Sequence, residues 1–366
     1  MNNKKNSRLL LIFFLVLVII IGLIFVNRKN LQISYYSKMS GYKETTISTF
    51  IDSDKYDVVS KHKYSKLLDE IVNTKYYNDK YIDEYLAIKY IEQDGYLENI
   101  SKMLDIGYDA NEINTIYEKL GNNGINYIKD NSYINDLIGL ISIDYFREDN
   151  IDRYVKYKNN NKDMLDSDIV LKVNIGLDNK YYTNVIDIEE SDKLDTIVNK
   201  YHRLSSSYSP NDLVQVKYGS VTLRKEAAEH FDKMCDDALK NGFLIYGGSG
   251  YRSYSHQAKL YNNYVAKDGF DNAERYSARP GYSEHQLGLA MDILNKNWQF
   301  ISKNDEEYTW LVNNSYKYGF ILRYPEGKEN ITGYMYEEWH FRYFGLKLAK
   351  ELYDKKLIYE EYLAMK

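Results

Sequence analysis

The chain has 366 residues, which is enough for more than one domain and a sizeable buried core. Its formal net charge is only −5, and no block or stripe of basic residues follows the pattern that binds a phosphate backbone, which argues against nucleic acid as a partner. The single cysteine, Cys235, excludes an intramolecular disulfide and a cysteine-based metal site. Any bound metal would therefore depend on histidines and carboxylates.

An unbroken apolar run from Leu9 to Val26 follows three basic residues at the N-terminus. A helix of this length rises about 27 Å, close to the thickness of the bilayer hydrocarbon. We predict a cytoplasmic tail over residues 1–8 and an uncleaved transmembrane anchor over 9–26, so that a single-pass cell-membrane protein holds the rest of its chain outside the cytoplasm. A cleaved signal peptide is the alternative, but no small-residue cleavage pattern follows the run.

The next two regions contain no cluster of histidines and carboxylates of catalytic type. Residues 27–60 are predicted to form a polar stalk, and residues 61–190 a mainly helical region. Two short segments within the latter, 104–109 and 173–178, are loosely similar and indicate a weak internal repeat. We expect this region to be a spacer or an interaction module for an unknown partner.

Helices and short strands are mixed without a regular βαβ rhythm after about residue 195. This pattern favours an α+β domain with a largely antiparallel sheet over residues 195–366. The expected elements are a helix over 222–240 capped by Thr222, a strand over 243–246 before a Gly-rich bend, a helix over 253–267, strands over 289–293, 320–324 and 339–343, and a closing helix over 346–353.

Two short segments contain histidines that stand close to carboxylates. In the first, His285 precedes Asp292, and Gly288 between them lets the chain turn back. Asp292 would interrupt an apolar strand, where a lone carboxylate is costly unless it is paired or bound to a metal. The second segment supplies His340 as the third protein ligand that a catalytic zinc needs besides water. We expect His62, His202 and His230 to be solvated or structural, although Glu229 and Asp232 flank His230. His256, which opens a helix next to the Gly-rich bend, stays open as a less favoured ligand.

A hydrolytic zinc also needs a base near its water, and a glutamate that does not bind the metal is the usual choice. Glu337 and Glu338 both precede His340. In an extended segment Glu338 would share a face with His340, whereas a turn before the strand would bring Glu337 there instead. Spacing leaves both glutamates open.

Four motifs occur in a fixed order: Gly250-Tyr251-Arg252-Ser253 with Gln257, then Ser277 to Gly281, Ser283 to Asp292, and Glu337 to Tyr343. In this order they resemble the VanY-type D-alanyl-D-alanine carboxypeptidases, a zinc peptidase family that also contains L,D-carboxypeptidases and D-Ala-D-Ala dipeptidases. The likeness spans about residues 195–360 and leaves out the helical region. It implies a hedgehog/DD-peptidase-like α+β fold for the catalytic domain.

The resemblance also implies a role for each site residue. Zn2+ would be bound by His285, Asp292 and His340. Glu337, rather than its neighbour, aligns with the catalytic base, and Arg252 aligns with the residue that holds negative charge on the substrate or the oxyanion. The implied substrate contacts are Arg252, Gln257, Ser283 and Trp339.

The implied activity is that of a membrane-anchored zinc D-alanyl-D-alanine carboxypeptidase that trims peptidoglycan stem peptides. An L,D-carboxypeptidase acting on tetrapeptide stems is the first alternative, because the two activities differ only in pocket shape. A catalytically silent wall-binding module is the second. Glu337 argues against the second alternative, because an inactive relative would be free to lose its base.

Overall fold

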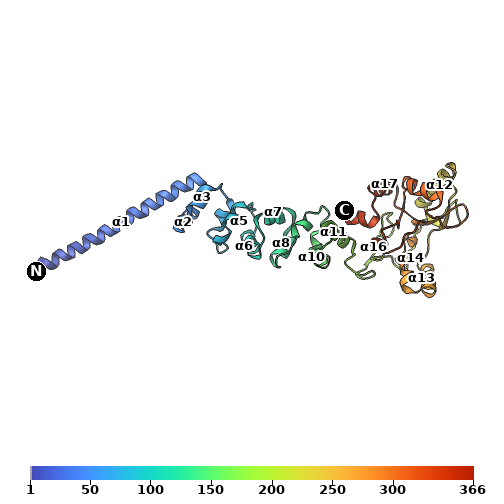
Figure 1. The fold of residues 1–366 in the computed structure, drawn as a ribbon, viewed down its shortest axis with the longest axis horizontal. Coiled ribbons are helices and arrows are strands. Elements are labelled where there is room, and N and C mark those ends of the chain that lie inside the picture. Colours follow the sequence, from blue (N-terminus) through green and yellow to red (C-terminus); the bar gives the residue numbers. More distant parts are fainter. Residues whose placement is uncertain (1) are drawn as a thin grey trace. The chain divides into compact units, whose positions relative to one another are not determined.

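The computed structural model describes residues 2–366, and the chain divides into two compact units, Met1–Ser142 and Ile143–Lys366 (Figure 1). The helical region was expected to end near residue 190, so the boundary lies earlier than predicted. The reason is the packing of the last helices of that region against the C-terminal end of the chain. Asn174, for example, donates its side-chain N–H to the backbone oxygen of Ala364 at 2.9 Å.

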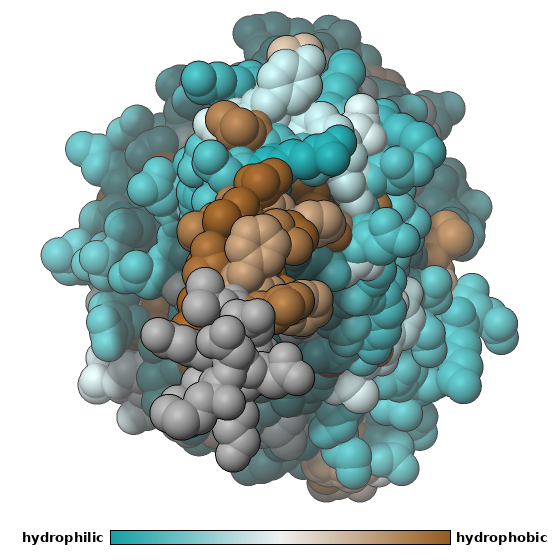
Figure 2. All heavy atoms as spheres, turned by 90° about the vertical axis from the view of Figure 1, so that its left-hand side faces the viewer, coloured by the Kyte–Doolittle hydropathy of each residue, from teal (hydrophilic) through white to brown (hydrophobic). Residues whose placement is uncertain are grey.

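The first unit begins with α1, a helix over Asn2–Ser40. Its segment Leu10–Ser40 contains a stretch long and apolar enough to cross a membrane, and none of that stretch is buried. Figure 2 shows hydrophobic side chains gathered in one group, coloured brown. Such a helix is typical of a membrane anchor and equally of a signal sequence. The predicted tail over 1–8 begins at Met1, outside the described residues, and its side chains are not described either.

The segment predicted to be a polar stalk is helical and partly packed. The helix α1 continues to Ser40, and α2 follows over Glu44–Asp52. Ile47 and Phe50 are fully buried in α2, three positions apart on one face of the helix. The stalk prediction was therefore wrong for this part of the chain, because apolar residues at helical spacing give α2 a face that packs.

Short helices make up the rest of the first unit, as the sequence predicted. Their apolar faces form its interior, with Leu67, Ile100 and Ile113 fully buried. They are α3 (Tyr56–Lys61), α4 (Lys66–Ile71), the 3-10 turn η1 (Asp79–Tyr81), α5 (Ile82–Ala87), α6 (Tyr96–Ile106), α7 (Ala110–Lys119), α8 (Asn122–Lys129) and α9 (Leu137–Ile141).

The weak sequence repeat corresponds to a repeated local structure. Gly107 and Gly176, 69 positions apart (176 − 107), both end a helix in the left-handed region, with φ of 119° and 99°. Tyr85 and Tyr154, at the same offset (154 − 85 = 69), each accept a hydrogen bond from the backbone N–H seven residues earlier, at 3.3 and 3.2 Å. The repeated unit is therefore longer than the two six-residue segments that first indicated it.

The second unit is built on a four-stranded antiparallel sheet in the order β5-β6-β8-β7, which agrees with the predicted α+β class. Two small two-stranded sheets, β1-β2 and β3-β4, accompany it. Its elements are η2 (Glu148–Asn150), α10 (Ile151–Asn160), α11 (Asp166–Ile175), β1 (Ile186–Asp187), β2 (His202–Arg203), β3 (Leu213–Gln215), β4 (Thr222–Arg224), α12 (Lys225–Lys240), β5 (Tyr246–Ser249), α13 (Tyr254–Asp268), α14 (Phe270–Tyr276), η3 (Glu284–Leu287), β6 (Ala290–Leu294), α15 (Glu306–Asn314), η4 (Ser315–Tyr318), β7 (Phe320–Leu322), α16 (Glu329–Thr332), β8 (His340–Tyr343), α17 (Leu346–Lys355) and α18 (Tyr359–Ala364).

The two faces of the central sheet differ in character. Met291 and Ile293 of β6 belong to the main hydrophobic core, which also contains Phe231 and the buried Cys235 of α12. Because side chains alternate along a strand, Asp292 points to the opposite face. The sheet therefore separates the apolar core from a polar site.

Two predicted elements are displaced in the structure. Thr222 pairs with Gln215 in the β3-β4 sheet instead of capping a helix, and α12 begins at Lys225. The predicted strand over 243–246 begins only at Tyr246 and runs through the Gly-rich segment. Glycine is required there because a Cβ on Gly248 would lie 2.7 Å from the side chain of Leu294.

Candidate metal centre and active site

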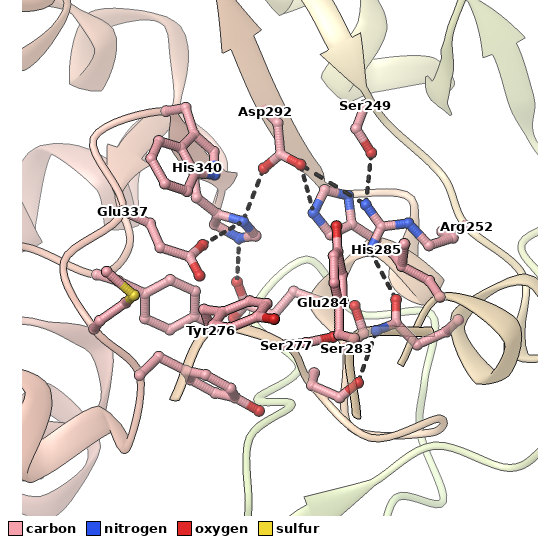
Figure 3. A pocket seen from close by; sticks show the side chains of 18 of the residues that line it. Ser249, Arg252, Tyr276, Ser277, Ser283, Glu284, His285, Asp292, Glu337 and His340 are labelled. Atoms are coloured by element: carbon pink, nitrogen blue, oxygen red, sulfur yellow. Dashed lines mark hydrogen bonds and ion pairs between the residues drawn. The ribbon is translucent and has the colours of Figure 1, made fainter. Parts of the chain in front are cut away.

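Three buried side chains from three segments meet beside the central sheet (Figure 3): His285 from η3, Asp292 from β6 and His340 from β8. Asp292 and His340 are directly opposite each other in the register of β6 and β8. His285 returns to them because Gly288, with φ of 67°, turns the chain between η3 and β6. One possible ligand atom of each residue lies within 4.8 Å of the others.

Asp292 lies between the two imidazoles. Its Oδ2 is 3.3 Å from Nε2 of His285, and its Oδ1 is 3.1 Å from Nδ1 of His340. Oδ1 is buried and accepts no hydrogen bond from the described part of the chain. A buried carboxylate oxygen without a donor is costly, and a cation between the three side chains would satisfy it.

The outward nitrogen of each imidazole has its own acceptor. Nδ1 of His285 donates to the backbone oxygen of Gly250 at 2.7 Å, so the lone pair of Nε2 faces Asp292. Nε2 of His340 lies 3.4 Å from Oε2 of Glu284, so Nδ1 faces Asp292. This arrangement is common around metal-binding histidines, because the outer acceptor fixes both the tautomer and the ring orientation. The donor set fits a divalent cation of the zinc type.

The charges of the cluster are coupled to one another. Burial alone would raise the pKa of Asp292, but His285 and His340 hold it well below its usual range. Burial opposes the charged form of His340, yet the adjacent carboxylates of Asp292 and Glu284 raise its pKa to about 9. A metal ion would therefore have to displace a proton from His340, which links metal binding to pH.

Of the two competing glutamates, Glu337 is the one that reaches the site. It is buried, and its Oε2 lies 3.6 Å from Nδ1 of His340, whereas Glu338 is half-buried and does not line the pocket. A turn before β8 causes this, with the backbone N–H of His340 donating to the oxygen of Glu337 at 3.2 Å. Burial raises the pKa of Glu337 to about 8.

Arg252 lies on the other side of Asp292, with its Nη2 at 3.8 Å from Oδ2. The guanidinium donates to Oε1 of Gln257 and to Oγ of Ser249, both at 2.7 Å. Ser253 caps α13 by accepting a hydrogen bond from a backbone N–H of its first turn, which fixes the start of the helix that carries Gln257. Two side chains thus hold the arginine over the site.

A pocket of about 270 Å³ opens over these groups. It is lined by every site residue that the sequence analysis named: Arg252, Gln257, Ser283, His285, Asp292, Glu337, Trp339 and His340. The structure therefore brings all of them together. Apart from Trp339, the aromatic residues of the wall were not predicted, because Tyr264, Tyr276, Phe300 and Tyr324 come from separate segments with no shared motif.

Glu284 was also missed by the sequence analysis. It stands between Ser283 and His285 and is almost fully buried, with Arg323 and Arg342 beside its carboxylate. No local signal could have found it, because the imidazole that its carboxylate faces, His340, lies 56 positions further along the chain.

Comparison with known proteins agrees with this geometry. Residues 220–346 match the family model for VanY, D-alanyl-D-alanine carboxypeptidase. The putative carboxypeptidase YodJ of Bacillus subtilis is 42% identical over 209 residues, which cover 51% of this chain and 75% of that protein. The chain belongs to the VanY family. Within that family, a D-alanyl-D-alanine carboxypeptidase of Enterococcus faecium is 36% identical over 182 residues, or 48% of this chain and 51% of that protein.

Among solved structures, the LdcB LD-carboxypeptidase is 39% identical to this chain. The alignment covers 51% of this chain and 92% of that one, with a TM-score of 0.48. The VanY model begins at residue 220, so the helices before that position are outside it.

Proposed function

We propose that this VanY carboxypeptidase is a membrane-anchored zinc enzyme that removes the terminal D-Ala from peptidoglycan stem peptides. The observation that carries the proposal is the buried cluster of His285, Asp292 and His340, with Glu337 on one side and Arg252 on the other. Zinc held by Nε2 of His285, the carboxylate of Asp292 and Nδ1 of His340 would supply a Lewis acid and a water of lowered pKa.

The side chains around this centre have distinct tasks. Glu337 takes a proton from the attacking water and passes it to the leaving amine. Arg252 stabilises negative charge, either on the terminal carboxylate of the substrate or on the developing oxyanion. Its planar guanidinium can donate hydrogen bonds to two oxygens at once. Gln257 and Ser249 keep the guanidinium in place. Ser283 and Trp339 line the pocket and contact the peptide.

The catalytic region spans residues 195–366 in this proposal, as the sequence predicted. Helices α10 and α11 belong to the same compact unit and support the end of the chain, as the bond from Asn174 to Ala364 indicates. The helices before them are a spacer or an interaction region between the anchor and the enzyme.

The bond that is cleaved can be identified by comparing two peptides. We expect the purified full chain, loaded with zinc in detergent, to release D-Ala from a pentapeptide ending in D-Ala-D-Ala at least tenfold faster than from the tetrapeptide. The ratio of kcat/KM for the two peptides, with D-Ala detected by mass spectrometry, measures this. The reverse ratio would indicate the L,D alternative, and no release from either by zinc-bound protein would indicate a silent wall-binding module.

The anchor proposal assigns residues 9–26 of α1 to the membrane and the catalytic unit to the outer side. We expect the protein to sediment with membranes, to resist alkaline carbonate and to dissolve only in detergent, with its N-terminal peptide still present by mass spectrometry. Protease added to intact cells without a wall should digest residues 143–366. Soluble protein in the medium that lacks the apolar run would contradict the anchor and support a cleaved signal peptide.

A further inference from the structure

A cluster of four buried charges lies directly behind His340. Glu284 accepts a hydrogen bond from Nε of Arg323 at 2.8 Å through its Oε1, and the same oxygen is 3.1 Å from Nη1 of Arg342. Its other oxygen, Oε2, faces Nε2 of His340 at 3.4 Å (Figure 3). One oxygen of Glu284 therefore holds the arginines, and the other holds the imidazole.

The cluster continues into the last helix of the chain. Arg323 donates both terminal nitrogens to the carboxylate of Glu360 in α18, at 2.8 and 2.6 Å. The side chain of Asn199 donates to the same carboxylate at 3.2 Å. The helix α18 lies beyond residue 346, where the VanY family match ends. A residue outside the matched region is thus three contacts away from His340, through Arg323 and Glu284.

The burial of these groups is nearly complete. Glu284, Arg323, Arg342 and Glu360 have exposed fractions of 1%, 1%, 0% and 3%. Buried ion pairs contribute little net stability compared with apolar residues of the same volume, because both charges lose their hydration. Their position beside His340 is better explained by Oε2 of Glu284, which presents a fixed acceptor to the imidazole.

The two histidines of the metal centre differ in the acceptor that their outward ring nitrogen faces. His285 donates to a neutral backbone oxygen of Gly250, whereas His340 faces a carboxylate. A carboxylate partner raises the basicity of the opposite ring nitrogen more than a carbonyl does, because it stabilises positive charge on the ring. The nitrogen affected is Nδ1, which faces Asp292 and Glu337.

We propose that Glu284 is the positioning residue of His340, and that Glu360 of the C-terminal helix holds Glu284 in place through Arg323. Glu284 accepts the Nε2–H of His340, so the metal is bound through Nδ1. The last helix is then part of the support of the metal centre. This inference rests on the proposed zinc site but not on peptidase activity, so metal binding without substrate tests it.

The test measures zinc affinity of the full chain in detergent by competition with a chromophoric chelator. We expect Glu284→Gln to weaken zinc binding about 10–100-fold, the range for loss of an outer partner of a metal ligand, and Glu360→Gln to weaken it less. Glu361→Gln is the matched control: this neighbour in α18 is also buried but pairs with Lys328, so zinc binding should not change.

Two further measurements keep the result interpretable. Cobalt substituted for zinc should show a shifted visible absorption spectrum in Glu284→Gln and the wild-type spectrum in Glu361→Gln. If Glu284→Gln does not fold, nitrogen-15 NMR of labelled histidine in the unmutated zinc-loaded protein should show His340 protonated at Nε2. Metal on Nε2 would overturn the proposal, as would wild-type affinity and spectrum in a folded Glu284→Gln. Absence of zinc binding in the wild-type protein would overturn the proposed function itself.

Discussion

Replacing Glu337 by glutamine should abolish turnover while zinc stays bound. The carboxylate lies 3.6 Å from Nδ1 of His340, beside the proposed metal position. We assign it as the base that takes the proton of the attacking water. General base catalysis contributes about 10²–10⁴-fold to a rate. We therefore expect kcat to fall by about 10³-fold in Glu337→Gln, with the zinc content measured by atomic spectroscopy unchanged.

The neighbouring glutamate provides the control for this experiment. Glu338 is half-buried outside the pocket, so Glu338→Gln should change kcat by less than about twofold. The pH profile adds a second criterion. The pKa of Glu337 is raised to about 8 by burial, and bound zinc would lower it by favouring the carboxylate. Wild-type kcat/KM should thus rise with pH along an acid limb below pH 8, and the residual activity of Glu337→Gln should lack that limb. An inactive Glu338→Gln beside an active Glu337→Gln would contradict the assignment.

Replacing Asp292 by asparagine should remove the metal. Asp292 contacts both imidazoles, and its Oδ1 has no hydrogen-bond donor within the described residues. We expect Asp292→Asn to lose more affinity for zinc than the roughly 10–100-fold that an outer partner contributes, and to be isolated without metal and without activity. Zinc content after gel filtration and the chelator competition measure this directly.

A second aspartate serves as its control. Asp212 also pairs with an arginine, Arg224, at 3.0 Å, but on the small β3-β4 sheet. Asp212→Asn should retain both zinc and turnover. Purified Asp292→Asn that carries one tightly bound zinc per chain would show that the metal site has been assigned to the wrong residues.

The sequence was sufficient for the parts of the site that depend on local spacing. Alternation along a strand correctly placed Met291 and Ile293 in the core and Asp292 on the opposite face. The turn at Gly288 likewise follows from a residue that adopts positive φ readily. The choice between Glu337 and Glu338 was different: it depended on a turn before β8 that spacing could not reveal, and family resemblance was needed.

Other features depend on contacts between distant segments. Glu284, Arg323 and Glu360 are 39 and 37 positions apart along the chain, so no local pattern connects them. The same reason explains the displaced elements. Threonine is a residue type that often caps helices, but Thr222 pairs with Gln215 and therefore lies in a strand. The Gly-rich segment was expected to be a bend, and only its close approach to Leu294 shows why a strand there needs glycine.

In the function proposed above, zinc in this VanY carboxypeptidase drives the release of D-Ala. The most direct measurement is D-Ala release from a peptide ending in D-Ala-D-Ala by the full chain in detergent, before chelation, after chelation and after zinc is restored. We expect release by the untreated enzyme, loss of release when zinc is removed, and recovery on addition of about one equivalent of zinc. Release that continues at the full rate in metal-free protein, or zinc-loaded protein that releases no D-Ala, would contradict the account.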